Sequence, residues 1–220
     1  MKLLFSRYFS HRRILLGVSL YFILMTAAVM LFHADPDGDK ADYIMCKFSA
    51  LTPMMFAVYL PVIFMIQDTV GNRFMRSVPC AGSLYLRGIP ALSVLLPLVW
   101  GVVTDVVYSA FILISGKDVC NISDMLIMTA IIGCTLSLIT CFALSFRAGS
   151  FALIAFYVPP VLLAIVLGKS ANGGFGLPLW ASALIFAGGC AAVFAADLLV
   201  SWLAYRKCSF KETTAPQNTT

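Results

Sequence analysis

Six long apolar runs constrain the fold of this chain more than any other feature. They cover Ile14–Phe32, Ser49–Ile66, Ala91–Ser115, Ile122–Phe146, Phe151–Gly168 and Leu177–Tyr205. Each is close to the roughly 20 residues that an α-helix needs to cross the hydrocarbon core of a bilayer. Apolar residues make up 61% of the chain and charged residues only 11%, which leaves too little polar sequence for a sizeable soluble domain. The sequence therefore predicts an all-α polytopic membrane protein with six transmembrane helices over residues 14–205.

The two ends of the chain differ from this transmembrane part. Residues 1–13 mix apolar side chains with arginines, a pattern typical of an amphipathic interfacial helix on the inner leaflet. A secretory signal is the other interpretation, but the run Ile14–Phe32 is longer than a usual signal core and lacks a small-residue cleavage site. Residues 206–220 end in the polar sequence ETTAPQNTT, which predicts a disordered cytoplasmic tail.

The distribution of basic residues predicts the orientation. With both termini in the cytoplasm, eleven Lys and Arg residues lie inside and four outside, and such an excess marks the cytoplasmic side. The inner set is Lys2, Arg7, Arg12, Arg13, Arg73, Arg76, Arg87, Arg147, Arg206, Lys207 and Lys211, and the outer set is Lys40, Lys47, Lys117 and Lys169. The net charge of +5 thus reflects membrane orientation and not nucleic-acid binding. We expect a multi-pass protein of a bacterial cell membrane.

The outer side carries an acidic loop and two of the cysteines. The loop HADPDGDKADYIMCK lacks the spacing and terminal Glu of a calcium-binding loop, so we expect it to be solvated. The seven cysteines include no CxxC pair, which predicts neither a metal site nor a redox framework. Cys46 and Cys120 both fall on the outer side, where a disulfide and two free thiols are the alternatives.

Catalytic and nucleotide-binding motifs do not occur in the sequence. HExxH, GxSxG and the P-loop are all missing, and both histidines lie at the ends of predicted spans. We therefore expect no enzyme activity and no cofactor or metal bound by this chain. Any transport must draw its energy from elsewhere.

Two acids, Asp105 and Asp197, lie deep in the predicted spans, and no Lys or Arg lies comparably deep. A carboxylate at this depth is costly, so we expect an interior or water-lined position. Asp105, with Thr104 and Tyr108 beside it, either lines a substrate or cation path or is a hydrogen-bonded structural acid. For Asp197, near the inner end of the last span, pairing with Arg206 or another inner cation is the favoured interpretation.

The segment Gln67–Pro90 connects the second and third apolar runs on the predicted cytoplasmic side. Its charged residues Arg73, Arg76 and Arg87 alternate with apolar side chains such as Phe74. This pattern is typical of short interfacial helices and offers an apolar, basic surface to a soluble partner.

The same segment carries a resemblance to a known family. An acid and a glycine follow the second span, a Ser-x-Pro sequence comes next, and a basic residue precedes the third span. In this chain those positions are Asp68, Gly71, Ser77, Pro79 and Arg87. Together with six spans, inner termini and the amphipathic start, they make the chain resemble the permease subunits of type-2 ATP-binding-cassette exporters. One departure is that residues 169–176 are too few for the re-entrant helices that such permeases often have before their last span, unless the last apolar run is subdivided.

The resemblance implies how such a protein would work. Two permease subunits, identical or different, would pair, and Gln67–Pro90 of each would dock on a separate cytoplasmic ATPase subunit that uses ATP. Closure of the ATPases would switch the bundle between inward and outward access and export a peptide, a lipid or an amphipathic compound. Two alternatives stay open: an ion-coupled secondary transporter that uses Asp105, and a non-transporting immunity or assembly protein that binds a cytoplasmic partner.

Overall fold

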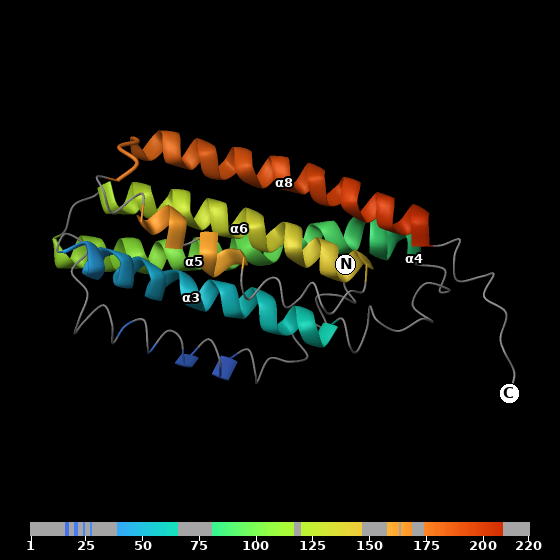
Figure 1. Cartoon of the computed structure of the whole chain (residues 1–220), viewed down its shortest axis with the longest axis horizontal. Helices are drawn as coiled ribbons and strands as arrows, with labels where there is room; N and C mark the ends of the chain where they lie inside the picture. The colour runs from blue at the N-terminus through green and yellow to red at the C-terminus, as the bar shows by residue number, and fades with distance from the viewer. Residues whose placement is uncertain are drawn as a thin grey trace, which may run out of the picture.

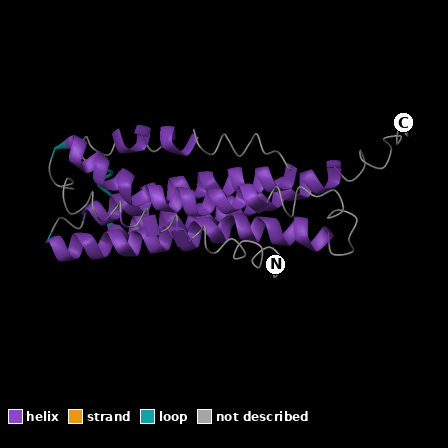
Figure 2. Cartoon of the chain, turned by 90° about the horizontal axis from the view of Figure 1, so that it is seen from below, coloured by secondary structure: helices purple, strands orange, loops and turns teal. Residues whose placement is uncertain are grey.

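The computed structural model describes residues 16–17, 20–21, 24, 27, 39–65, 81–116, 120–146, 158–162, 164–168 and 174–208. Within these ranges every regular element is a helix (Figure 2). The predicted interfacial helix 1–13 and residues 209–220 of the predicted tail lie outside the described residues, as does most of the first predicted span. The all-helical prediction is thus confirmed for the described part of the chain.

Four long helices form the described body and run side by side along one axis (Figures 1 and 2). They are α3 (Lys40–Met65), α5 (Ile89–Ser115), α6 (Cys120–Phe146) and α8 (Leu179–Cys208). Helix α6 packs mainly against α8 and α5, and α3 packs against α5 and α6. By length and composition, the described residues contain four helices able to cross a membrane, compared with six predicted spans.

Helix α3 begins nine residues before the predicted second span, and this corrects the prediction of a solvated loop up to Lys47. Lys40 and Asp42 lie in the first turn of the helix, where an acid interacts favourably with the helix dipole. Lys47 is fully buried rather than solvated. The charged residues of this stretch predicted a loop. Lys47 can nevertheless be buried in a helix because it pairs with the carboxylate of Asp124 on α6.

The end of the segment 67–90 is helical and continuous with the third span. Helix α4 (Ala81–Ser83) and the π-helical turn η3 (Leu84–Gly88) lead directly into α5. Pro90 accounts for the π turn, because its ring displaces the carbonyl four residues earlier and its nitrogen has no hydrogen to donate. The widened turn is closed by the N–H of Ile89, which bonds to the carbonyl of Leu84 five residues before. This part of the segment is therefore the start of a long helix and not a separate interfacial one.

Helices α6 and α8 run in the same direction along the bundle (Figure 1), and residues 147–178 connect them in the sequence. α6 ends and α8 begins at opposite ends (Figure 1). A shorter apolar helix, Val158–Gly168, lies on this connection and covers the last part of the fifth predicted span. Residues 174–178 before α8 are not helical, and Gly174 and Gly176 have positive φ angles of 70° and 62°.

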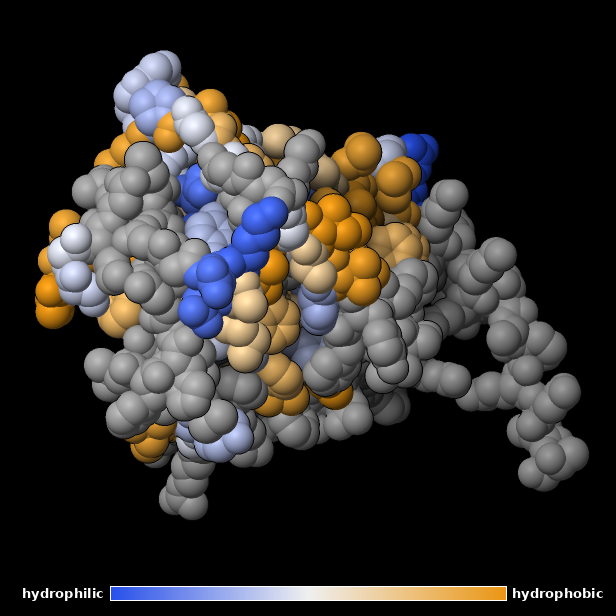
Figure 3. All heavy atoms as spheres, turned by 60° about the vertical axis from the view of Figure 1, so that its left-hand side comes forward, coloured by the Kyte–Doolittle hydropathy of each residue, from blue (hydrophilic) through white to orange (hydrophobic). Residues whose placement is uncertain are grey.

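Small residues let α5, α6 and α3 approach closely. A Cβ atom added at Gly101 of α5 would lie 2.9 Å from Cγ2 of Thr129 on α6, and one at Gly133 would lie 3.3 Å from the Met54 side chain of α3. Close backbone approach at small residues is the usual way in which apolar helices associate in a membrane. The outer faces of α5 and α8 expose large apolar side chains. Figure 3 shows the end of the bundle that lies on the left in Figure 1, where hydrophilic residues are surrounded by apolar surface.

Candidate functional site

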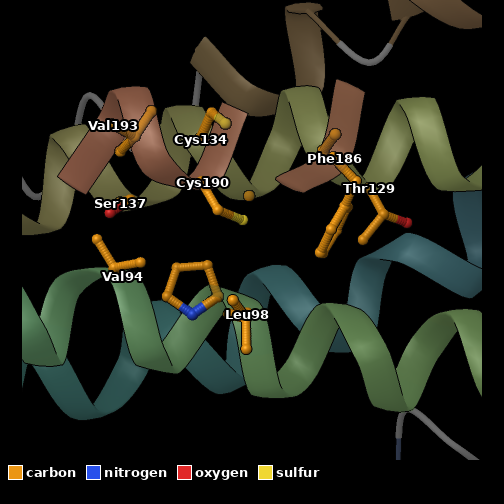
Figure 4. Close-up of a pocket in the computed structure, with 11 residues that line it drawn as sticks. Val94, Leu98, Thr129, Cys134, Ser137, Phe186, Cys190 and Val193 are labelled. Carbon is orange, nitrogen blue, oxygen red and sulfur yellow. The ribbon is translucent and has the colours of Figure 1, made fainter. Parts of the chain in front are cut away.

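A cleft lies between α5, α6 and α8 (Figure 4). Its enclosed space of about 20 Å³ is far below the usual range for ligand pockets of about 300–1,000 Å³ and has room for about one water molecule. Its lining is mostly apolar, with two hydroxyls and two thiols: Val94, Pro97, Leu98, Thr129, Ala130, Gly133, Cys134, Ser137, Phe186, Cys190 and Val193. In this arrangement of the helices the cleft is therefore a small, mainly apolar gap and not an open ligand pocket.

The two hydroxyls of the lining each donate to one of the two deep acids. Thr129 Oγ1 donates to Oδ1 of Asp105 at 2.7 Å, and Ser137 Oγ donates to Oδ2 of Asp197 at 2.7 Å. Thr129 and Ser137 are eight residues apart on α6, which separates them by about 12 Å along the helix axis. The acids that the sequence singled out are thus attached to two separate positions along one cleft.

Asp105 and its predicted companions do not form one cluster. Asp105 is only partly buried, and its bond to Thr129 ties α5 to α6. The Thr104 hydroxyl donates to the Trp100 carbonyl of its own helix at 2.8 Å. Tyr108 is fully buried in the core. Of the three predicted path residues, Asp105 is the one whose hydrogen bond to a residue of the cleft lining is established.

Asp197 is fully buried and belongs to a polar ladder between α6 and α8. Cys141 lies one turn beyond Ser137 on α6, and its sulfur lies 3.4 Å from the Asp197 carbonyl and 3.3 Å from Ser201 Oγ. Ser201 Oγ also lies 3.0 Å from Ser145 Oγ, which extends the ladder by another turn. The two helices are thus joined by side-chain hydrogen bonds at successive turns.

The predicted pairing of Asp197 with Arg206 is wrong. Nine residues separate them on one helix, so Arg206 lies about 13 Å further along the axis, beyond the reach of an ion pair. The guanidinium of Arg206 instead lies over the ring of Trp202, 5.1 Å from its centroid. Among the described residues, Oδ1 of the Asp197 carboxylate has no hydrogen-bond partner.

Most predicted docking residues lie outside the described residues: Asp68, Gly71, Arg73, Phe74, Arg76, Ser77 and Pro79. Arg87 is described and exposed, on the turn η3. Beside it, Tyr85 is buried and its ring lies 6.3 Å from that of Tyr205 near the end of α8. A Cβ atom at Gly82 would lie 3.4 Å from the Tyr205 hydroxyl. The described end of the segment therefore packs directly on the end of α8.

A buried charged cluster at the other end of the bundle is not predicted from the sequence. Asp124 of α6 accepts hydrogen bonds from the Tyr43 hydroxyl at 2.8 Å and from the Phe175 N–H at 3.0 Å. Its Oδ2 lies 3.8 Å from Nζ of Lys47, which also lies 3.7 Å from the centroid of the Tyr43 ring. A Cβ atom at Gly174 would come within 2.9 Å of the same carboxylate. The cluster thus fastens the segment before α8 to α3 and α6.

Two signals in the sequence pointed to this cluster. Lys47 stands between apolar residues in IMCKFSA, and Asp124 falls inside the predicted span Ile122–Phe146. Nearby, Ser123 Oγ donates to the Leu177 carbonyl at 2.7 Å and lies 2.6 Å from Ser182 Oγ. Lys47 and Asp124 have opposite charges and lie at the outer ends of two predicted spans. This pattern could have predicted an ion pair between them.

Cys46 is buried in α3 and Cys120 is the first residue of α6, and a disulfide between them stays a prediction. Among the described residues, no three His, Cys, Asp or Glu side chains gather in a way that could hold a metal ion.

The fold and the cleft define a helical chain with four described helices able to cross a membrane, which is compatible with a multi-pass membrane protein. Comparison with protein-family models, with curated proteins and with solved structures gave no match.

Proposed function

We propose that this chain is the membrane-spanning permease subunit of an ATP-driven exporter, powered by a separate cytoplasmic ATPase of the ATP-binding-cassette class. The contact between the described end of the segment 67–90 and α8 carries the proposal. Residues 81–88 continue into α5 and pack through Tyr85 on Tyr205 of α8. A movement of this segment would therefore act on both α5 and α8. These two helices line the cleft together with α6.

This arrangement supports alternating access. The ATPase would bind the basic segment, including Arg73 and Arg76, on the cytoplasmic side of the cell membrane. The bundle would have two arrangements, and the ATP-bound ATPase would bind one of them more tightly than the other. The difference between these two affinities sets how far ATP binding shifts the equilibrium. The cleft between α5, α6 and α8 would then open alternately to the two sides. A second permease subunit, identical or different, would complete the transporter.

The chemistry of the cleft favours an amphipathic cargo, such as a lipid, a peptide or a small amphiphile. Its lining is largely apolar, and its polar groups are two hydroxyls in contact with carboxylates and two thiols. The sequence carries no P-loop, so this chain cannot supply the energy itself.

Co-purification in mild detergent tests the proposal. We expect the chain to be recovered with an ATPase subunit that has a P-loop and no membrane span, and to stimulate its ATP hydrolysis. Reversing the two charges, Arg73→Glu with Arg76→Glu, should weaken this association at least about tenfold, because two favourable charge contacts become repulsive. Lys40→Glu, an exposed cation at the other end of the bundle, is the matched control and should leave the association unchanged. Equal recovery of the ATPase with the double variant would refute docking at this segment.

One observation favours an ion-coupled secondary transporter as the second candidate. Asp105 is partly exposed and hydrogen-bonded to a hydroxyl of the cleft lining, an arrangement that suits a carboxylate that exchanges a cation. In that case Asp105→Asn would abolish transport driven by an ion gradient in vesicles that contain no ATPase. Transport that needs ATP and survives the substitution would exclude this candidate.

A further inference from the structure

We propose that residues 174–178 form a strap that closes one end of the bundle, with Ser123 and Asp124 of α6 as its latch. When the strap is released, the start of α8 moves away from α6 while the rest of α8 stays attached. The space between α5, α6 and α8 then opens towards that end. The inference rests on the proposed transport function and gives it a gate on the side that the charge distribution predicts to be outside.

The space between α5, α6 and α8 is closed in this structure. Its volume of about 20 Å³ has room for about one water molecule, so a cargo can enter only after one of these helices moves. Helix α8 lies at the edge of the four-helix body in Figure 1. Among the four long described helices, α8 has the smallest share of its apolar stretch buried. It is therefore the helix that can move with the least loss of packing.

Hydrogen bonds hold the strap and the start of α8 on two neighbouring residues of α6. The N–H of Phe175 donates to Oδ1 of Asp124 at 3.0 Å, and Ser123 Oγ donates to the Leu177 carbonyl at 2.7 Å. Ser123 Oγ also lies 2.6 Å from Ser182 Oγ of α8. Because the single Ser123 hydroxyl proton goes to Leu177, Ser182 is the donor of this last bond. These three bonds form the latch.

The backbone of the strap is suited to a change of conformation. Residues 174–178 are not helical, so they can rearrange without breaking the hydrogen bonds of a helix. Gly174 and Gly176 have φ angles of 70° and 62°, which glycine adopts without steric cost, and loop residues of this kind are common hinges. Gly174 also lies against the latch, because an added Cβ atom would come within 2.9 Å of Oδ2 of Asp124. The strap thus combines the hinge and the contact.

Asp124 keeps its partners on α3 when the strap is released. Its Oδ2 accepts a hydrogen bond from the Tyr43 hydroxyl at 2.8 Å and lies 3.8 Å from Nζ of Lys47. The N–H of Phe175 is bonded to the other oxygen, Oδ1. A buried carboxylate without a cation is strongly unfavourable, and release of the strap leaves the cation in place. The latch therefore opens between α6 and the strap, while α3 stays on α6.

The other half of α8 supplies the pivot. Ser137 donates to Asp197 at 2.7 Å, and the sulfur of Cys141 lies 3.3 Å from Ser201 Oγ. Ser201 Oγ lies 3.0 Å from Ser145 Oγ. These contacts repeat at successive turns on one face of each helix, and release of the strap breaks none of them. The expected motion is a rotation of α8 about this half.

Thiol labelling of the purified chain in lipid nanodiscs, where both faces of the bilayer are accessible, tests the inference. The native cysteines are replaced, with serine at Cys141 to keep a hydrogen-bonding group between α6 and α8. Ala130→Cys places a thiol in the closed space, and Ala204→Cys places one at a buried position near the other end of α8. The rate of reaction with a charged, water-soluble methanethiosulfonate measures how often each position opens to water.

The latch and the pivot are then weakened separately. Ser123→Ala removes two of the three latch bonds and should raise the labelling rate of Ala130→Cys at least about tenfold, with the rate of Ala204→Cys within about twofold of its original value. Gly174→Ala should give the same pattern, because its Cβ displaces the strap from the carboxylate. Ser145→Ala, the matched control, removes a hydroxyl from the pivot and should not raise the rate of Ala130→Cys.

Two outcomes would overturn the inference. One is an unchanged rate of Ala130→Cys in Ser123→Ala or in Gly174→Ala. The other is an equal increase at both labelled positions, which would show a general loosening of the bundle. No ATPase is present in these measurements, so their outcome is separate from that of the proposed function. A chain that shows the expected pattern but does not associate with an ATPase would refute the exporter and keep the strap, and the opposite result would do the reverse.

Discussion

The buried pair of Lys47 and Asp124 makes a quantitative prediction about stability. Lys47 is fully buried and lies 3.8 Å from the carboxylate, which also accepts hydrogen bonds from Tyr43 and from the N–H of Phe175. Removing one partner of a buried pair costs about 3–5 kcal/mol because the other charge stays behind in a medium of low dielectric constant. We therefore expect Asp124→Asn to lower the free energy of unfolding by about 3–5 kcal/mol.

The two single substitutions differ in a way that follows from the contacts. Asn at position 124 has one oxygen and so keeps at most one of the two hydrogen bonds, whereas Lys47→Met leaves both of them to the carboxylate. Lys47→Met should therefore cost less than Asp124→Asn, by about 1 kcal/mol for the retained hydrogen bond. The double variant removes both charges and should cost less than the sum of the two by about 1–3 kcal/mol.

The assay is a chemical unfolding titration of the purified chain in mild detergent, followed by tryptophan fluorescence. Asp39→Asn, at an exposed acid near the same end of the bundle, is the control and should stay within about 0.5 kcal/mol of the original chain. Additive costs in the double variant, or a loss below about 1 kcal/mol for Asp124→Asn, would show that the two charges are not coupled in the folded chain.

Two further predictions use the same titration and pairs of glycines. Gly174→Ala should cost more than Gly176→Ala: both have positive φ angles, for which about 1–2 kcal/mol is expected, but only at Gly174 would the new Cβ meet a carboxylate oxygen at 2.9 Å. Equal losses would argue against that contact. Gly101→Ala should cost about 1–3 kcal/mol because its Cβ would lie 2.9 Å from a threonine methyl on α6. Gly188→Ala on α8 meets nothing within 4 Å and should be neutral or stabilising by up to about 1 kcal/mol, so a loss at this position would contradict the packing described.

Hydropathy predicted the long helices well where their residues are uniformly apolar. The predicted span Ile122–Phe146 differs from α6 only at its first residues, and Ala91–Ser115 ends where α5 ends. α5 stops there because Gly116 adopts a positive φ of 65° and its N–H bonds to the carbonyls of the last turn. A long apolar run is by itself enough to predict a helix of membrane-spanning length, so composition finds these helices without knowledge of their partners.

Positions that depend on distant partners were the ones that the sequence could not predict. The start of α3 was placed nine residues late because Lys47 reads as a loop residue until its partner on α6 is known. Asp105 and Asp197 were recognised as deep acids, yet their partners lie on another helix, 24 and 60 residues away in the chain. A pairing of Asp197 with Arg206 followed from nearness in sequence, and helix geometry excludes it.

Cysteine labelling measures the side of the membrane on which the segment 67–90 lies, and this position is the basis of the proposed function. In a background without native cysteines, Ser83→Cys at the exposed end of α4 would be treated with a membrane-impermeant maleimide, alongside Lys40→Cys at the exposed start of α3. We predict that in intact cells Lys40→Cys reacts and Ser83→Cys does not, and that Ser83→Cys reacts once the membrane is opened. Reaction of Ser83→Cys in intact cells would place the segment outside, out of reach of a cytoplasmic ATPase, and would contradict the account.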